Sequence, residues 1–302
     1  MVTTQTSVLP EWLRKLYPFT PHKFVTPGGA TMSYVDEGPR SDEAVLMLHG
    51  NPTWSFFYRD LIRQLAPHLR CVAPDHIGMG LSEKPEVYPY TLDRRIGDIA
   101  ALVRTLGLKH IRLVVHDWGG AIGFGLATRY PELIDRIVIL NTAAFLSKRI
   151  PLRIALCRAP GIGSWLVRSL NGFAGPATRM AMHARSLSRD EKRGYLFPYD
   201  SWSNRVAVHR FVTDIPMEKD HPTRVTMKEI EEKLDLLADR PKLILWGGRD
   251  FCFNDHFLEQ WQRIYPRAAV HRFPNAGHYV LEDTGTEARD RAVQFLRRAE
   301  FI

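Results

Sequence analysis

Val115-His116-Asp117-Trp118-Gly119-Gly120 is the stretch that decides the fold of this 302-residue chain. Residues 112–115 are predicted to end a strand, and residues 118–129 have the apolar spacing of a helix. A small residue at Gly119 allows a sharp turn, which would present Asp117 on a strand-to-helix elbow. The alternative is that Asp117 only caps the following helix, because Asp is a favoured N-cap residue.

Two further motifs at strand ends provide the partners that such a nucleophile needs. Leu245-Trp246-Gly247-Gly248-Arg249-Asp250 ends one predicted strand in a carboxylate, and Phe273-Pro274-Asn275-Ala276-Gly277-His278 follows the last strand. Because ligands bind at the carboxyl ends of parallel strands, we expect these side chains to meet there. Asp117 is then the nucleophile, His278 handles the proton, and Asp250 orients the imidazole. The chain order of the three resembles that of α/β-hydrolase triads.

A fourth motif, His49-Gly50-Asn51-Pro52-Thr53, follows the predicted strand 44–48. Behind an elbow of this kind, the corresponding loop donates hydrogen bonds to the anion formed in the reaction. The side-chain amide of Asn51 and the indole N–H of Trp118 are donors of the right type. We expect these two groups to bind a leaving group that departs as an anion. Four other polar residues are expected to be structural and to brace the loops: His49, His76, His116 and Asp75.

A carboxylate nucleophile narrows the range of reactions. Attack by Asp117 on an ordinary ester carbonyl would give a reactive anhydride, so esterase and lipase activities of the serine type are disfavoured. Displacement at a saturated carbon gives an alkyl-ester intermediate instead. Reactions of that kind open epoxides, displace halide or open strained lactones.

Strand-like and helix-like runs alternate along most of the chain, which predicts a doubly wound sheet with right-handed crossovers. From Ala44 onward the predicted strands are nearly all apolar, as in strands buried on both faces of a parallel sheet. The predicted strands are residues 22–26, 31–36, 44–48, 71–74, 111–115, 134–140, 243–246 and 269–273. The predicted helices are residues 56–65, 92–106, 118–129, 256–264 and 287–298, with Asp255 and Thr286 as N-caps of the last two.

The alternation stops after Asn141 and resumes at Leu243, and residues 146–216 have a helical pattern broken by Pro and Gly. We therefore expect an α/β-hydrolase fold: an eight-stranded, mostly parallel sheet with helices on both faces and an inserted helical cap. The expected parts are the α/β-hydrolase core, residues 1–145 and 217–302, and the cap, residues 146–216.

The net charge of +8 is concentrated in the predicted cap, which holds twelve Lys and Arg against four Asp and Glu. A solvated basic face is one interpretation of this excess. The other is a surface for an anionic membrane, an acidic partner or a carboxylate-bearing substrate. Nucleic acid is not expected as a partner, because no nucleic-acid-binding motif accompanies the charge.

The sequence gives no reason to expect a cofactor or a metal, since it contains no zinc-type cysteine pairs, no His-Glu-x-x-His and no phosphate loop. Cys71, Cys157 and Cys252 are odd in number and widely spaced, which favours free thiols in the reducing cytoplasm. Residues 1–19 lack the pattern of a secretory signal. No apolar run reaches the roughly 18 residues that a membrane-spanning helix needs.

The elbow, the Asn51–Trp118 pair and the Asp that ends the seventh predicted strand resemble the third subgroup of the haloalkane dehalogenase family. This resemblance covers nearly the whole chain. Asn51 argues against epoxide hydrolases, which usually carry an aromatic residue there. Tyr195 and Tyr199 leave that option open, because epoxide hydrolases use tyrosines of the cap as acids.

Within this family, four segments are similar to the β-lactone decarboxylases of bacterial long-chain olefin biosynthesis: residues 12–19, 152–158, 194–202 and 249–253. Two of them lie in the predicted cap, which sets the substrate in this fold. The resemblance implies a hydrophobic cis-3,4-dialkyl-2-oxetanone as substrate, a cis-alkene and carbon dioxide as products, and other enzymes of olefin biosynthesis as candidate partners. Asp117 could attack either the saturated ring carbon or the lactone carbonyl. A haloalkane dehalogenase and a non-catalytic binding protein are the alternatives.

Overall fold

A mostly parallel sheet runs through the computed structural model, which describes residues 2–3 and 9–298. Over these residues its strand order is β1-β2-β3-β5-β4-β6-β7-β8-β9. Strands β1, β2, β3 and β5 pair antiparallel in that order, and all pairs from β5 to β9 are parallel. The strands are β1 (Val2–Thr3), β2 (His22–Val25), β3 (Thr31–Glu37), β4 (Glu43–Leu48), β5 (Cys71–Pro74), β6 (His110–Asp117), β7 (Ile134–Thr142), β8 (Lys242–Gly247) and β9 (Ala269–Phe273).

All eight predicted strands form, as β2 to β9, and the two-residue strand β1 extends the antiparallel edge. The apolar runs in the middle of the sheet are buried on both faces, and every residue of β5 and β8 is buried. The edge strand β9 is mostly exposed or half-buried. The continuous apolar pattern from Ala44 onward therefore correctly predicts burial in the parallel part of the sheet.

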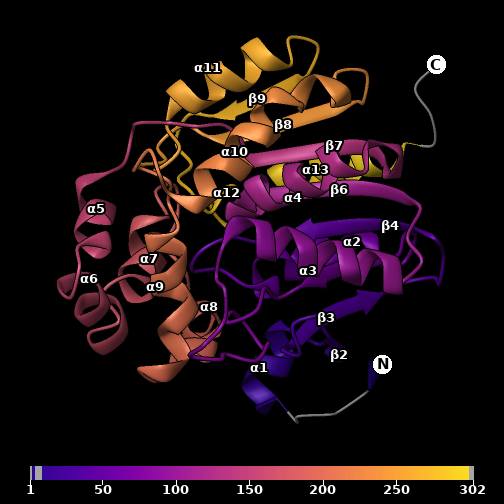
Figure 1. Ribbon diagram of the computed structural model, residues 1–302. Helices are drawn as coiled ribbons and strands as arrows, with labels where there is room; N and C mark the ends of the chain where they lie inside the picture. The colour runs from indigo at the N-terminus through magenta and orange to yellow at the C-terminus, as the bar shows by residue number, and fades with distance from the viewer. Residues whose placement is uncertain (1, 4–8, 299–302) are drawn as a thin grey trace.

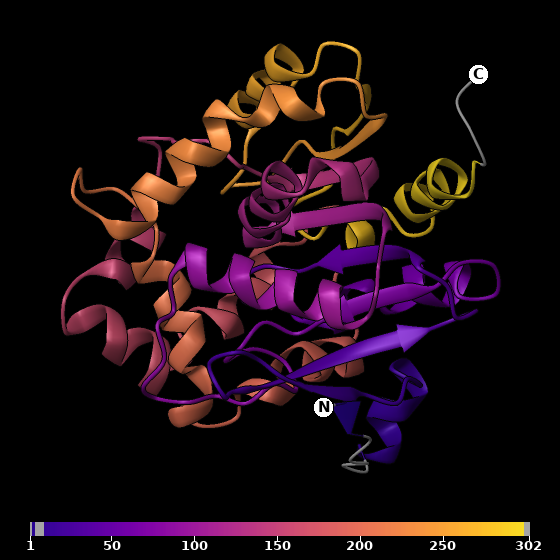
Figure 2. The ribbon, with the colours of Figure 1, turned by 45° about the vertical axis from the view of Figure 1, so that its right-hand side comes forward.

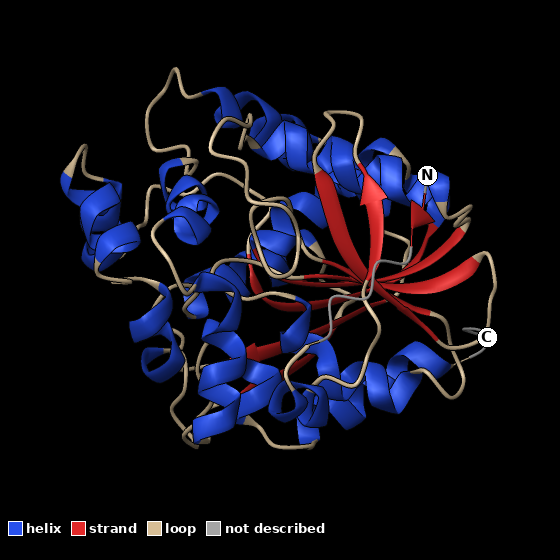
Figure 3. Cartoon of the chain, turned by 90° about the horizontal axis from the view of Figure 1, so that it is seen from below, coloured by secondary structure: helices blue, strands red, loops and turns tan. Residues whose placement is uncertain are grey.

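Helices cover both faces of this sheet, as an end-on view shows (Figure 3). On one face α3 (Leu92–Thr105), α4 (Trp118–Arg129) and α10 (Pro222–Glu232) pack against one another, and on the other α2 (Arg59–Leu65) packs against α13 (Glu287–Arg297). The remaining helices outside residues 146–216 are short or lie at an edge: α1 (Glu11–Leu16), η1 (Ser55–Tyr58), η2 (Pro131–Leu133), η6 (Leu234–Leu237), α11 (Asp255–Ile264) and α12 (Val280–Asp283).

One predicted N-cap is wrong. The side chain of Asn254, not Asp255, accepts a hydrogen bond from the first turn of α11, at 3.1 Å from the His256 nitrogen. Thr286 does occupy the N-cap position of α13, but its side chain makes no capping hydrogen bond. Adjacent Asn and Asp are equally good caps, so the sequence pattern alone does not decide between them.

Residues 146–216, called here the helical segment, contain helices and no strand among the described elements. They gather on one side of the molecule, away from both labelled ends of the chain (Figure 1), and stay on that side when the view is turned (Figure 2). None of the described helices is long and apolar enough to span a bilayer. The helices of this segment are α5 (Leu152–Arg158), α6 (Ile162–Ser164), the π-helical η3 (Trp165–Ser169), α7 (Ala174–Met180), α8 (Arg189–Leu196), η4 (Phe197–Tyr199), η5 (Ser203–Arg205) and α9 (Val206–Thr213).

Candidate active site

Asp117 lies on a sharp elbow between β6 and α4. Its φ of 51° is in the left-handed region, which few residues other than glycine adopt. The following backbone fits closely against β4, since a Cβ on Gly119 would lie 1.9 Å from the Leu48 carbonyl oxygen. The Asp117 side chain makes no capping hydrogen bond to α4. The capping alternative is therefore wrong, and the elbow instead leaves the carboxylate available to the site.

The structure brings the three predicted residues together. His278 Nδ1 lies 2.6 Å from Asp250 Oδ2, and His278 Nε2 lies 3.7 Å from Asp117 Oδ2. All three side chains are buried. The second oxygen of Asp250 accepts the backbone N–H of Cys252 at 2.7 Å, so this carboxylate is held at both ends. The imidazole is thereby oriented by one carboxylate and faces the other.

Burial and charge act on this pair in opposite directions. Burial raises the pKa of Asp117 above its ordinary value, while His278 and the backbone N–H groups of Asn51 and Trp118 oppose the rise. Burial alone would lower the pKa of His278, but the charges of Asp250 and Asp117 outweigh it and raise that pKa. A protonated imidazole is therefore favoured beside an ionised Asp117.

Asn51 contributes a donor that sequence reasoning missed. Its backbone N–H donates to Asp117 Oδ1 at 2.6 Å. Its side-chain amide donates to the carbonyl of Val208 in α9 at 3.0 Å, which leaves one further N–H on the same nitrogen. The Asn51 amide was expected to donate to the anion of the reaction. In the structure it also joins its loop to the helical segment, which the sequence did not indicate. No sequence motif reports backbone donors, because every residue except proline carries one.

Trp118 lies beside Asp117 and lines the same cavity as Asn51. Its ring is half-buried and packs against Phe211 of α9, with the ring centroids 5.5 Å apart. Both predicted anion-binding residues therefore border the space in front of Asp117.

The cavity in front of Asp117 has a volume of about 400 Å³ and is lined mostly by apolar side chains. That size and character suit a hydrophobic small molecule. Asp117 and His278 line this cavity, and the helical segment supplies much of its wall. The wall residues from that segment are Leu146, Ser147, Arg149, Ile150, Pro151, Arg153, Ile154, Leu156, Cys157, Leu166, Gly172, Phe173, Pro176, Ala177, Met180, Ala181, Val212, Ile215 and Pro216.

Tyr195 and Tyr199 do not line this cavity. Both are buried, and the Tyr195 hydroxyl donates to Glu282 at 2.6 Å while the Tyr199 hydroxyl donates to the Thr53 carbonyl at 3.2 Å. Neither is placed to protonate an epoxide in front of Asp117, so the structure removes the argument that kept the epoxide hydrolase option open.

The four polar residues expected to be structural do brace the loops. The backbone N–H of His76 donates to His49 Nε2 at 3.1 Å, and the carboxylate of Asp75 accepts backbone N–H groups at 2.7 and 2.8 Å. His116 Nε2 donates to the carbonyl of His278 at 2.9 Å. The last contact fixes the backbone of the predicted base from behind.

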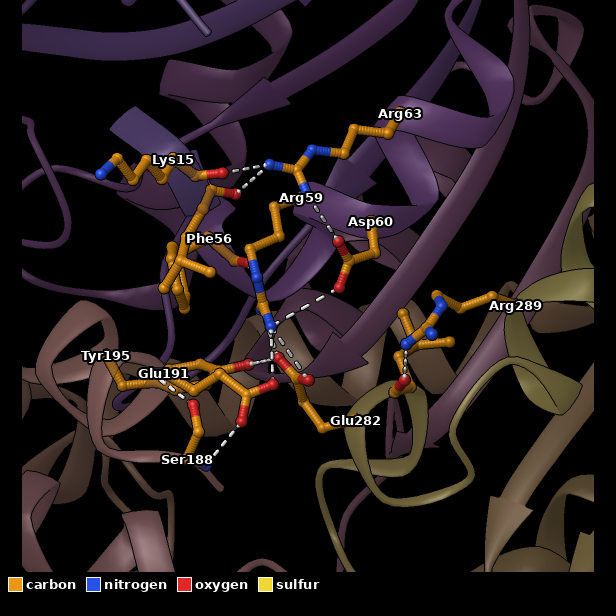
Figure 4. A network of polar contacts seen from close by, with 12 residues as sticks. Lys15, Phe56, Arg59, Asp60, Arg63, Ser188, Glu191, Tyr195, Glu282 and Arg289 are labelled. Carbon is orange, nitrogen blue, oxygen red and sulfur yellow. Dashed lines mark hydrogen bonds and ion pairs between the residues drawn. The ribbon is translucent and has the colours of Figure 1, made fainter. Parts of the chain in front are cut away.

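Two adjacent carboxylates, which sequence reasoning missed, join the helical segment to the His278 loop. Asp283 accepts the backbone N–H groups of Gly277, His183 and Arg185 at 2.6, 2.7 and 2.9 Å. Glu282 is almost fully buried and accepts hydrogen bonds from Arg59 and Tyr195 (Figure 4). Arg185 also donates to Glu282, at 2.8 Å. The loop that carries His278 is thus joined to the core through Arg59 and to the helical segment through His183, Arg185 and Tyr195.

Comparison with known proteins identifies the family to which this chain belongs. Residues 43–284 match the family of proteins with the α/β hydrolase fold. The cis-3-alkyl-4-alkyloxetan-2-one decarboxylase of Shewanella oneidensis is 43% identical over 296 residues, which cover 96% of this chain and 92% of that protein. A protein of the same name from Xanthomonas campestris is also 43% identical, over 88% of this chain and 92% of its own length.

Haloalkane dehalogenases are more distant. Haloalkane dehalogenase 2 of Mycobacterium tuberculosis is 29% identical over 89% of this chain and 92% of that protein. The crystal structure of haloalkane dehalogenase DbeA from Bradyrhizobium elkani superposes with a TM-score of 0.80 and 27% identity, over 92% of this chain and 97% of that chain. The motif-based resemblance to both groups is confirmed. The chain belongs to the α/β-hydrolase-fold family, as a homologue of the cis-3-alkyl-4-alkyloxetan-2-one decarboxylases and, more distantly, of the haloalkane dehalogenases.

Proposed function

We propose that this chain decarboxylates cis-3-alkyl-4-alkyloxetan-2-ones to cis-alkenes and carbon dioxide. The observation that carries the proposal is the 43% identity to relatives of that name, against 29% to a haloalkane dehalogenase. Because the match covers 96% of the chain, it extends through the helical segment as well as the sheet. In this fold the inserted helices border the substrate, so similarity there bears on the reaction more than similarity of the triad does.

In this proposal Asp117, His278 and Asp250 form the catalytic triad. Residues 146–216 are the cap, and residues 1–145 and 217–302 are the core; residues 1, 4–8 and 299–302 of that core lie outside the described part of the structure. Other enzymes of olefin biosynthesis remain candidate partners. The cytoplasm is the proposed location, on the grounds that Cys71, Cys157 and Cys252 are free thiols.

The first chemical step is displacement by Asp117 at the ring carbon that carries the ring oxygen. Oδ1 is held by the Asn51 backbone N–H, which leaves Oδ2 as the attacking atom. A bond forms between Oδ2 and the ring carbon, with inversion, while the bond from that carbon to the ring oxygen breaks. The freed carboxylate of the substrate is an anion, and the N–H groups of Asn51 and Trp118 border the space that it enters.

The second step expels the nucleophile without water. The bond between the carboxylate carbon and the adjacent ring carbon breaks, its electron pair forms the carbon–carbon double bond, and the ester bond to Asp117 breaks. Carbon dioxide and the free Asp117 carboxylate result. Inversion followed by anti elimination preserves the cis relation of the two alkyl chains. Attack at the lactone carbonyl is the rival first step, and it would give a mixed anhydride that hydroxylamine traps as a hydroxamate.

His278 has no water to activate in this route. Its raised pKa favours an imidazolium, held by Asp250, beside the Asp117 carboxylate that is regenerated at the end of each turnover. A positive charge there stabilises the departing carboxylate. In a hydrolase the same residue must instead be neutral to act as general base.

Trp118→Phe tests the indole donor. Phenylalanine keeps a ring to pack against Phe211 but removes the N–H, and loss of one such donor lowers kcat by roughly 10²- to 10³-fold. Trp202→Phe, on the exposed surface and outside the cavity, is the matched control. The measurement is steady-state lactone turnover, with circular dichroism to check folding. If Trp118→Phe keeps kcat within about twofold of the wild-type value, the indole plays no such role.

The proposed reaction is tested by offering the purified enzyme a long-chain cis-dialkyl oxetanone and a set of haloalkanes in parallel. We expect cis-alkene by gas chromatography and little halide, because small haloalkanes fit loosely in a cavity of about 400 Å³ and misalign the attack. The DbeA likeness favours a dehalogenase as the second candidate. Rapid halide release, with a β-hydroxy acid and no alkene from the lactone, would assign the chain to that second function.

A further inference from the structure

Exposed apolar side chains are concentrated on three consecutive helices of the helical segment. Among the described residues, thirteen large apolar side chains are exposed, and five of them lie between residues 152 and 170. Leu152 is 85% exposed, and Trp165 is 56% exposed. The five are Leu152 and Leu156 on α5, Ile162 and Trp165 on α6 and η3, and Leu170 at the end of η3. Because α5 packs against α6, they belong to one region of the surface.

This region also carries an excess of positive charge, part of which is unpaired among the described residues. Residues 146–189 contain eight Lys and Arg and no Asp or Glu. Lys148, Arg149 and Arg153 are exposed, and none of the three forms an ion pair with any described residue. Two other arginines are excluded from this surface: Arg158 pairs with Glu218 at 2.6 Å, and Arg168 is buried and pairs with Glu86 at 2.6 Å.

The same residues stand at the wall of the cavity. Arg149, Arg153 and Leu156 line it, while Leu152 and Trp165 lie outside it. Helices α5 and α6 form the outer edge of the molecule, on the side away from both ends of the chain (Figure 1). An apolar surface with a basic border therefore leads directly to an apolar cavity. We call this surface the docking face: Lys148, Arg149, Leu152, Arg153, Leu156, Ile162, Trp165 and Leu170.

We propose that the docking face binds peripherally to a bilayer that contains anionic lipid. Charge complementarity favours this partner, because exposed Lys and Arg beside apolar helix faces are what an interfacial helix needs to bind at an anionic headgroup layer. Tryptophan is enriched at that boundary, where its ring meets both apolar chains and water. Docking would also place the cavity next to the lipid. A water-insoluble substrate would then have a path into the site, an inference that rests on the proposed function.

The test is flotation of the purified full-length protein with vesicles of phosphatidylcholine, alone or mixed with phosphatidylglycerol. We expect flotation with the anionic vesicles, weakening as salt rises because the charges are screened. Lys148→Gln/Arg149→Gln/Arg153→Gln should lower the partition coefficient on the order of a hundredfold, since each cation near an anionic surface contributes a factor of roughly five. Leu152→Ser/Trp165→Ser should lower it by more than about tenfold.

Matched controls remove similar groups from the core surface. Arg104→Gln/Lys233→Gln/Arg297→Gln removes three exposed cations, and Val225→Ser removes an exposed apolar side chain. Both controls should float like the wild-type protein. Absence of binding to anionic vesicles at low salt overturns the proposal, as does equal loss in the controls.

The two proposals fail separately. Lactone presented in detergent micelles does not require a bilayer, so Leu152→Ser/Trp165→Ser should keep the wild-type rate there. Alkene formation without flotation overturns the docking proposal alone. Flotation without alkene formation overturns the proposed function alone.

Discussion

Replacing Asp117 by Ala removes turnover of the lactone, to below about one percent of the wild-type rate, because a covalent nucleophile cannot be bypassed. The carboxylate is buried, and burial raises its pKa, so the folded state bears a cost for keeping it ionised. Loss of activity is therefore expected without loss of stability, as at sites where function and stability conflict.

The elbow conformation needs its own control, since a φ of 51° with a ψ of −126° is strained for any residue that has a Cβ. Asp117→Asn keeps a side chain of nearly the same shape but is a far weaker nucleophile, and it should be equally inactive in the initial rate. Thermal unfolding and gas-chromatographic detection of alkene are measured on both variants. A folded Asp117→Ala protein that retains more than about one percent of the rate shows that another group attacks the substrate.

Replacing Glu282 by Ala gives the largest expected loss of stability, about 3–5 kcal/mol in the free energy of unfolding. The reason is that Arg59 is only 3% exposed and would lose its buried carboxylate partner. Chemical denaturation measures the loss. Glu287→Ala is the matched control, because its i,i+4 pair with Arg291 is exposed and contributes less than about 1 kcal/mol.

A double variant distinguishes the effect of losing the Arg59–Glu282 ion pair from the effect of leaving the buried Arg59 charge unpaired. Arg59→Met/Glu282→Leu removes both charges and should recover much of the stability, because a buried ion pair is often no better than apolar packing of similar volume. Equal destabilisation by Glu282→Ala and Glu287→Ala contradicts this account of the buried network (Figure 4). Because Glu282 follows Tyr279 by one turn, Glu282→Ala should also lower kcat by displacing His278.

The main lines of the fold and site followed from local patterns in the sequence. Asp117, Asp250 and His278 each follow a predicted strand within five residues, and the parallel sheet brings the ends of such strands together. The N-cap residue of α11 was harder to predict, because the adjacent residues Asn254 and Asp255 have equal propensity for that position.

Contacts between distant parts of the chain could not be predicted in the same way. Arg168 looked like one more cation of a basic surface, yet it pairs with Glu86, which is 82 residues away. Glu282 and Asp283 lie outside every predicted helix and strand, yet their partners lie from 6 to 223 residues away. Such pairs depend on how the helical segment packs on the core, and no local pattern encodes that packing.

The central claim is that Asp117 carries the substrate as an ester and is released by elimination, not by water. The most direct measurement is turnover of a cis-dialkyl oxetanone in H₂¹⁸O, followed by mass spectrometry of the peptide that contains Asp117. Elimination breaks the bond between the substrate carbon and the Asp117 oxygen, so we predict cis-alkene together with an unlabelled Asp117. Hydrolysis would bring water to the Asp117 carboxyl carbon, so ¹⁸O in Asp117 together with a β-hydroxy acid would contradict the account.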